Sequence, residues 1–191
     1  MYQHSLKRIL DFLLALFGLL VLWPVFLIIA IAIKIDDPGP VFFSQKRVGL
    51  HKRYFQLYKF RSMKVSTPDV PTHLLEHPEQ YISRVGGFLR KTSLDELPQL
   101  LNILRGDMAI IGPRPALWSQ EDLIAERDQY GANDVRPGLT GWAQVNGYRG
   151  NTSIRKRIDY DLYYIENWSV GLDVKIILLT FFKGFINKNA Y

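Results

Sequence analysis

The chain contains no cysteine, and this absence excludes several kinds of chemistry at once. Without a thiol there is no disulfide bridge, no thiolate metal site and no cysteine nucleophile. Histidine is also scarce, since only four of the 191 residues are histidines. The one close pair, His73 and His77, lies in a polar stretch with three prolines, so we expect no metal site there.

The common signatures of nucleotide and serine hydrolases are absent as well. The chain has no phosphate-binding G-x-x-x-x-G-K-[ST], no G-x-G-x-x-G, no H-E-x-x-H and no G-x-S-x-G. Acidic residues are in the minority, with 18 against 24 basic ones, which gives a net charge of +6. This excess predicts an anionic partner: nucleic acid, lipid headgroups or a phosphorylated substrate.

Only one stretch lacks charge for long enough to enter a bilayer. It runs from residue 12 to residue 33, and sixteen of its 22 residues are Leu, Ile, Phe or Val. Insertion of such a run is favourable by about 5 to 10 kcal/mol, which exceeds the ~3 kcal/mol that a proline inside a helix costs. We therefore expect membrane association. A cleaved signal peptide is not expected, because the run is too long and no A-x-A-like site follows it.

The residues alone leave open whether this helix spans the membrane or re-enters it. Lys7 and Arg8 precede the run, and eight basic residues follow it within residues 34–64. A spanning helix would place one basic flank on the outer side, against the positive-inside tendency. A bend at Trp23-Pro24 could instead return both flanks to the cytoplasm, although Pro24 leaves a carbonyl to be satisfied within hydrocarbon.

The remaining pattern predicts an α+β fold that is mainly helical, with a small β-hairpin and amphipathic interfacial helices. Two β-prone pieces within residues 36–63 predict the hairpin, and residues 66–80 are typical of a surface loop. Helices are predicted from Asp95, over 116–131 and over 153–169, with a glycine-dense loop at 135–150. Residues 173–186 are too interrupted by lysine to span a membrane, so we expect an interfacial helix.

Two adjacent acids, Asp95 and Glu96, stand at the start of one predicted helix. Ser93 and Glu96 fit the S-x-x-E capping box, but a helix begun at Ser93 would carry Pro98 at an unfavourable position. A helix begun at Asp95 avoids this conflict and places the acids beside unsatisfied N–H groups, which suit a phosphate. Since carboxylates also act as nucleophiles in phosphoryl chemistry, capping and catalysis both remain as interpretations.

Other polar residues allow functional and structural interpretations. Asp159 and Asp161 resemble a metal-binding D-x-D, but on a helix they point to nearly opposite sides, so we favour structural roles. In the glycine-dense loop, Arg136 and Arg149, together with Trp142 and Gln144, could bind a diphosphate and a flat base. Trp142 is also suited to the core or to the membrane interface, and we favour this structural interpretation.

Four segments together resemble the bacterial sugar transferase family, the monotopic phosphoglycosyl transferases, over residues 5–183. They are YKFRSM, TSLDELPQLLNILRGDMAIIGPRP, VRPGLTGWAQVNG and YDLYYIENWSVGLDVKIILLT. The resemblance implies transfer of a sugar-1-phosphate from a UDP-sugar to polyprenyl (undecaprenyl) phosphate, through an aspartyl-phosphosugar intermediate and with Mg²⁺. This reaction would be the first membrane step of glycoconjugate or exopolysaccharide assembly.

The resemblance also implies roles for particular residues. Asp95 is expected to be the nucleophile and Glu96 its dyad partner, both as Mg²⁺ ligands. The residues expected to bind phosphate or substrate are Lys59, Arg61, Arg90, Arg114, Arg136 and Gln144. The chain departs from many members in having Trp23-Pro24 where they have Ser-Pro at the re-entrant bend. The motif GYRGNT is similar to that of hexose-1-phosphate transferases, which favours a hexose.

The resemblance further implies a minimal catalytic form without an additional transmembrane domain. Residues 1–35 would form a re-entrant helix with basic flanks, and residues 36–191 a cytoplasmic interfacial catalytic domain on the bacterial inner membrane. The expected partners are a UDP-sugar, polyprenyl phosphate and membrane lipid, without nucleic acid. The main alternative is a membrane-anchored, non-enzymatic binder of anionic lipid or nucleic acid, which would bind in a salt-dependent manner and would not need Asp95. A polytopic transferase is disfavoured, since only one run can enter the bilayer.

Overall fold

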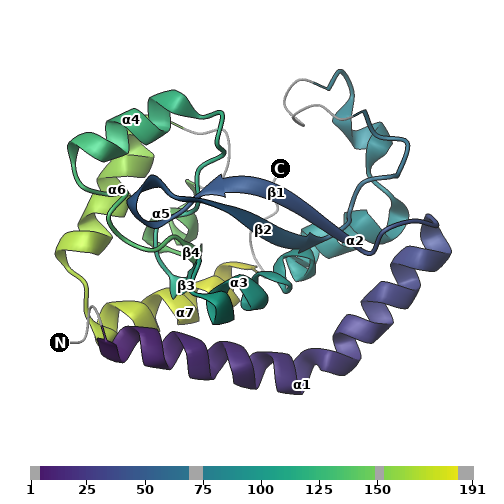
Figure 1. Cartoon of the computed structure of the whole chain (residues 1–191), viewed down its shortest axis with the longest axis horizontal. Coiled ribbons are helices and arrows are strands. Elements are labelled where there is room, and N and C mark those ends of the chain that lie inside the picture. Colours follow the sequence, from purple (N-terminus) through teal and green to yellow (C-terminus); the bar gives the residue numbers. More distant parts are fainter. Residues whose placement is uncertain (1–4, 69–74, 149–152, 185–191) are drawn as a thin grey trace.

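A computed structural model describes residues 5–68, 75–148 and 153–184 of the chain. Most of these residues are helical, and two small sheets complete an α+β arrangement (Figure 1). This agrees with the predicted fold class in its secondary structure. His73 and Arg149, considered above, lie outside the described residues.

The longest element is helix α1, Lys7–Asp36, which is long and apolar enough to cross a membrane. It runs along one edge of the molecule and bends partway along its length (Figure 1). Pro24 lies inside this helix, where its ring and its missing N–H are the usual cause of a kink. The adjacent Trp23 is 63% exposed, so it does not join the protein core.

The two halves of α1 pack against different helices of the same domain. Ala15, in the first half, belongs to a buried cluster with Leu100 and Ile103. These two residues belong to α3, Gln99–Arg105. Ile29 and Ile33, in the second half, pack in a cluster with residues of strand β2, Tyr54–Phe60, and of α2, Arg84–Thr92. Both ends of the long helix are therefore attached to the domain that follows it.

The predicted hairpin is confirmed. Strand β1, Phe42–Val48, pairs antiparallel with β2, Tyr54–Phe60, from Phe42 opposite Phe60 to Val48 opposite Tyr54. A 3₁₀ turn, Leu50–Lys52, lies in the connection. Leu57 and Phe60 of β2 are three residues apart and point to opposite faces of the strand, yet both are buried. Leu57 packs against α3 and Phe60 packs against α2, so the strand lies over the two helices that flank the acidic pair.

The helix predicted to begin at Asp95 is instead divided into a turn and a helix. Helix α2 ends at Thr92, Ser93 adopts a left-handed conformation with φ of 57°, and a 3₁₀ turn covers Leu94–Glu96. Helix α3 begins only at Gln99, after Pro98. The Ser93 side chain makes no capping hydrogen bond, so the capping box is not formed. Pro98 cannot donate within a helix, which explains the late start of α3.

The predicted glycine-dense loop contains short regular elements. Strand β3, Ala109–Ile111, pairs parallel with β4, Gly138–Thr140, and α5, Trp142–Val145, follows directly. A Cβ at Gly138 would lie 2.1 Å from the amide nitrogen of Gly112. Glycine is required there because the two backbones approach this closely.

Three longer helices complete the fold, and the last of them packs against β3 and β4. They are α4, Glu121–Gln129, α6, Ile154–Glu166, and α7, Val170–Gly184. The helix predicted over 116–131 starts five residues later, because residues 116 and 117 pair with the end of β1. Helix α7 lies beside the first half of α1 (Figure 1), where Lys7 and Asp173 form a buried ion pair of 3.0 Å.

Candidate active site

The acidic pair lies in the 3₁₀ turn between α2 and α3, below strand β2. Asp95 is 7% exposed and Glu96 is 6% exposed. A carboxylate removed from water to this extent needs compensating cations or hydrogen bonds. The surroundings of the pair provide them.

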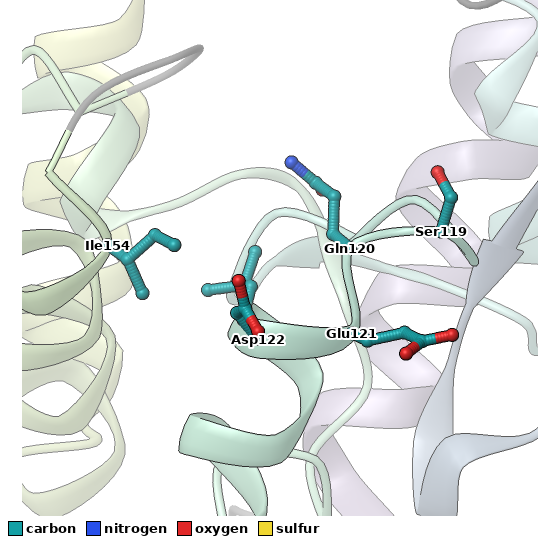
Figure 2. Close-up of a pocket in the computed structure, with 6 residues that line it drawn as sticks. Ser119, Gln120, Glu121, Asp122 and Ile154 are labelled. Carbon is teal, nitrogen blue, oxygen red and sulfur yellow. The ribbon is translucent and has the colours of Figure 1, made fainter.

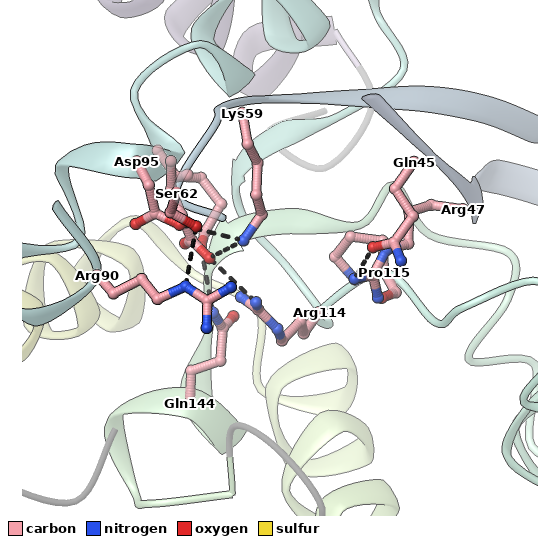
Figure 3. Close-up of polar contacts among 11 residues, drawn as sticks. Gln45, Arg47, Lys59, Ser62, Arg90, Asp95, Arg114, Pro115 and Gln144 are labelled. Atoms are coloured by element: carbon pink, nitrogen blue, oxygen red, sulfur yellow. Dashed lines mark hydrogen bonds and ion pairs between the residues drawn. The ribbon is translucent and has the colours of Figure 1, made fainter. Parts of the chain in front are cut away.

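Lysine and arginine side chains from several elements converge on the two acids (Figure 3). Lys59 of β2 places its Nζ 2.8 Å from Glu96 Oε1 and 3.7 Å from Asp95 Oδ2. Arg114 donates from a guanidinium nitrogen to the same Glu96 oxygen at 3.0 Å. Arg90 of α2 extends toward the acidic pair and donates to Ser62 Oγ at 2.9 Å. Three cations thus surround two carboxylates, which leaves a positive local balance.

The charge on Arg114 is fixed by its acidic neighbours. Burial acts to lower the pKa of Arg114, but the charge and hydrogen bond of Glu96, together with the charge of Asp95, outweigh burial and raise the pKa above its ordinary value. The acidic neighbours therefore favour the charged form of the guanidinium. Such a fixed charge beside buried carboxylates suits the binding of a diphosphate.

Gln144 of α5 extends toward the arginine side chains from the opposite side (Figure 3). The residue is 7% exposed, and its Nε2 donates to the Leu139 carbonyl at 3.1 Å. Because a carbonyl only accepts, this bond fixes the orientation of the amide. Its Oε1 is buried and has no hydrogen-bond partner among the described residues.

Two predicted residues make their contacts elsewhere. Arg61 binds Asp37 and donates from Nε to the Pro40 carbonyl at 2.6 Å, which attaches it to the turn after α1. Arg136 donates from Nε to the Gly106 carbonyl at 3.0 Å, at the end of α3. The structure shows neither residue in contact with the acidic pair, so their substrate-binding roles stay predictions.

The two acids of the D-x-D make separate ion pairs, as expected for residues on nearly opposite sides of a helix. Asp161 is 2% exposed and pairs with Arg127, whereas Asp159 pairs with Arg155 on the surface. Trp142 stacks on Tyr163, with ring centroids 5.6 Å apart, and packs against the cluster around α7. This is the core role considered for it.

A cavity of about 340 Å³ opens near the start of α4 (Figure 2). Its lining has two carboxylates, from Glu121 and Asp122, and no basic side chain among the described residues. Such a lining would repel a diphosphate. The cationic cluster around the acidic pair is therefore the better candidate site.

The acidic pair has a donor set that suits Mg²⁺. This ion prefers oxygen ligands and is commonly held by one or two carboxylates, with water and substrate phosphates completing its shell. Asp95 and Glu96 supply two adjacent carboxylates, and no third acidic or histidine side chain joins a metal-type cluster within the described part of the chain. A metal held here would thus need substrate oxygens.

Three arginines that contact the backbone next to this site were not predicted from the sequence. Arg47, Arg127 and Arg157 donate to the backbone carbonyls of Arg114 and Pro115. They come from β1, α4 and α6, far apart in the sequence. No spacing along the chain brings them together, so only the fold could show this cluster.

The fold and the site together define a small domain with one bilayer-length helix and a buried acid pair among cations. The family model described as bacterial sugar transferase matches residues 2–187, and the chain belongs to this family. It is 46% identical to the UDP-glucose:undecaprenyl-phosphate glucose-1-phosphate transferase of Escherichia coli K12, over 99% of this chain and 42% of that protein.

Other relatives carry similar names. The chain is 43% identical to the UDP-glucose:undecaprenyl-phosphate glucose-1-phosphate transferase of Caulobacter vibrioides, over 97% of this chain and 72% of that protein. It is 40% identical to the UDP-N-acetylgalactosamine-undecaprenyl-phosphate N-acetylgalactosaminephosphotransferase of Aeromonas hydrophila, over 92% of this chain and 42% of that protein. The chain spans about two fifths of the length of several such relatives.

Proposed function

We propose that this chain transfers a sugar-1-phosphate from a UDP-sugar to undecaprenyl phosphate, through a covalent intermediate on Asp95. The observation that carries the proposal is the buried acid pair beneath Lys59, Arg90 and Arg114. An attacking carboxylate can approach an anionic diphosphate only where cations offset the repulsion. The printed names of the relatives supply the donor and the acceptor.

In the proposed reaction, Asp95 attacks the β-phosphorus of the UDP-sugar. The bond from this phosphorus to the bridging oxygen breaks, and UMP leaves with the electron pair. The resulting acyl phosphate carries the sugar, and an oxygen of the lipid phosphate then attacks the same phosphorus. This second displacement releases the Asp95 carboxylate and yields the lipid diphosphate sugar, so each step is balanced.

The surroundings of the two acids support different roles for them. Glu96 Oε1 accepts two short charge-assisted hydrogen bonds, from Lys59 at 2.8 Å and Arg114 at 3.0 Å. A carboxylate held in this way is a weaker nucleophile and a better orienting group. Lys59 lies farther from Asp95, at 3.7 Å, and Asp95 is the position that the family resemblance assigns to the attacking residue. When bound by these two acids, Mg²⁺ would offset negative charge on the phosphates.

We propose that the donor is a UDP-hexose and that Gln144 contributes to its recognition. Several relatives are named for UDP-glucose, and one is named for UDP-N-acetylgalactosamine. The buried Gln144 Oε1 would accept a hydrogen bond from a donor on the sugar or the base, since a buried acceptor without a partner is costly. The excess of positive charge at the site would attract the diphosphate of the donor.

We also propose that α1 re-enters the membrane and that the catalytic domain lies on the cytoplasmic side of the bacterial inner membrane. At its start, Arg8 donates to the Ile103 and Leu104 carbonyls of α3. At its end, Asp36 accepts from the Val85 amide of α2 at 2.9 Å. A straight spanning helix would carry one of these ends away from the domain, which supports a bent helix that enters and leaves on one side.

The proposed mechanism makes a direct prediction for enzyme without lipid acceptor. When purified protein is incubated with UDP-glucose and Mg²⁺ alone, it should release UMP and gain the mass of one hexose phosphate on Asp95. Asp95→Asn keeps the size of the side chain and should abolish the adduct and turnover, measured by intact-protein mass spectrometry and peptide mapping.

The matched variant is Glu96→Gln, which should turn over slowly and never carry an adduct at position 96. UMP release that depends strictly on the lipid acceptor would indicate a single displacement instead. If Asp95→Asn kept normal activity, Asp95 would not be the nucleophile. A non-enzymatic binder would release no UMP under any of these conditions.

A further inference from the structure

The segment that carries Arg114 to the acidic pair lies between two prolines, Pro113 and Pro115. Neither proline has an N–H to donate to a neighbouring strand, and a residue before proline favours extended conformations. Its carbonyl groups must therefore find donors outside regular structure, because unpaired backbone groups are costly when buried.

Backbone donors hold the ends of this segment. The Pro113 carbonyl accepts from the Gly138 amide at 2.9 Å, and the Ala116 carbonyl accepts from the Val48 amide at 3.0 Å. Between them, the donors are side chains.

The Arg114 carbonyl accepts from two guanidinium groups at once. Arg127 of α4 donates to it at 3.0 Å, and Arg157 of α6 donates at 2.9 Å. Arg47 of β1 holds the next carbonyl, that of Pro115, at 3.0 Å. Three elements of the fold thus converge on two consecutive peptide groups.

This arrangement is electrostatically costly. Arg127 is 4% exposed and Arg157 is 5% exposed. Arg127 forms an ion pair with Asp161, whereas Arg157 forms no ion pair with a carboxylate among the described residues. Burial, together with the nearby charge of Arg127, lowers the pKa of Arg157 to about 9. The Nε atoms of both arginines are buried and have no hydrogen-bond partner among the described residues. Apolar side chains would fill the α4–α6 contact at lower cost.

We propose that Arg127 and Arg157 are positioning residues, which hold the Arg114 backbone so that its guanidinium meets the diphosphate of the donor. Asp161 accepts a hydrogen bond from the Arg127 guanidinium and thereby holds Arg127 in place. The proposal rests on the proposed function, in which Arg114 binds phosphate. It assigns the buried arginine cluster a role in catalysis, through Arg114 and without contact with the substrate.

Arg157 is the better residue for a test. Its hydrogen bond to the Arg114 carbonyl involves no carboxylate, whereas removal of Arg127 would leave the buried Asp161 charge without its partner. The experiment is a double-mutant cycle with Arg157→Met and Arg114→Ala in the full chain. It measures kcat/KM for UMP release from UDP-glucose, the Kd for UDP and the Tm of all four proteins. Arg155→Met, on the exposed side of α6, is the matched control.

Arg157→Met alone should lower kcat/KM roughly 10- to 100-fold, because a small misplacement of a binding group can cost about 100-fold. In the Arg114→Ala background the same substitution should lower it less than about twofold, since the group that it positions is absent. The Kd for UDP should follow this pattern, while Tm should change equally in both backgrounds. Arg155→Met should leave kcat/KM unchanged.

An equal loss of kcat/KM in both backgrounds would overturn the positioning role and leave the proposed function intact. Wild-type activity of Arg157→Met would also overturn it. If Arg114→Ala cost nothing, the phosphate-binding role of Arg114 would fail, and the proposal would fail with it. Absence of UMP release by the parent protein would instead refute the proposed function. Should Arg157→Met not fold, Arg157→Lys gives the same cycle with the same criteria, since lysine lacks the forked donors.

Discussion

At the scale of single residues, the acidic pair is specified by what surrounds it. Adjacent acids in a first helical turn are common, and their usual role is to satisfy backbone N–H groups. Here the Ser93 side chain makes no capping bond, and one oxygen of Glu96 is shared by Lys59 and Arg114. A carboxylate used only for capping would not need two partly buried cations from other segments. The contacts therefore favour chemistry over capping.

Gln144 offers a prediction on donor recognition. Gln144→Met keeps the length of the side chain and removes the buried acceptor Oε1. A neutral hydrogen bond contributes about 0.5 to 1.5 kcal/mol, so KM for the UDP-sugar should rise roughly two- to tenfold, with a smaller change in kcat. Steady-state kinetics with UDP-glucose test this. Gln129→Met, exposed at the end of α4, should keep the parent KM, and an unchanged KM in Gln144→Met would remove Gln144 from the site.

Some residues of the candidate site could be predicted from the sequence, and others could not. Asp95, Glu96, Arg90 and Arg114 lie within 25 residues of one another, and the family resemblance assigned all four to one site. The positioning residues Arg127 and Arg157 could not be predicted, because their common partner is a backbone carbonyl created by the Pro-Arg-Pro segment. Side-chain types can be read along a sequence, whereas acceptors on the backbone depend on the fold.

At the scale of elements, the segments with a clear periodicity could be predicted from the sequence, whereas the short strands could not. The hairpin, α6 and α7 follow from alternating or helical patterns over seven or more residues. Strands β3 and β4 have three residues each, and they form only because Ala109 and Gly138 meet across the fold. Helix α2 was not predicted, since it contains Gly86 and Gly87, which have low helix propensity. The glycine is nonetheless required, because a Cβ at Gly86 would lie 2.0 Å from the Ser62 carbonyl oxygen.

The end of α1 provides a prediction on pH dependence. Asp37 accepts from the Val65 amide at 2.8 Å and pairs with Arg61, and these bonds, that of Val65 foremost, lower the pKa of Asp37 below its usual 3.8. A group whose pKa is lowered by folding stabilises the protein above its usual pKa, and this contribution is lost as the pH falls through the lowered value. Asp37→Asn should therefore lower Tm at neutral pH, and the difference should vanish well below pH 3.8.

Thermal unfolding in detergent from neutral pH to strongly acidic pH tests this. The matched control is Glu76→Gln, on an exposed residue in the connection before α2, which should follow the parent curve. A difference in Tm that stays constant across the whole pH range would show that Asp37 contributes through packing and not through its charge.

At the scale of the whole molecule, exposed apolar side chains lie on two neighbouring helices. Exposed apolar side chains line α1, and others occur on α7, including Leu178, Phe181 and Phe182. The two helices lie side by side, joined by the buried pair of Lys7 and Asp173. A surface of this kind is costly in water and favourable in lipid. Hydropathy alone could predict that the chain meets a membrane, but the attachment of both ends of α1 to one domain required the fold.

This attachment leads to a prediction of topology, which the absence of native cysteine makes easy to test. Single cysteines at Ser5, before α1, and at Ser66, after β2, mark the two sides of the helix, and both serines are exposed. If α1 re-enters, neither cysteine should react with a membrane-impermeant maleimide in intact cells, and both should react after permeabilisation. Reaction of Ser5→Cys alone would establish a spanning helix, and it would require the Arg8 contacts with α3 to break. Reaction of both would place the domain outside the cell, on the side opposite to the cytoplasmic one that the basic flanks of α1 favour.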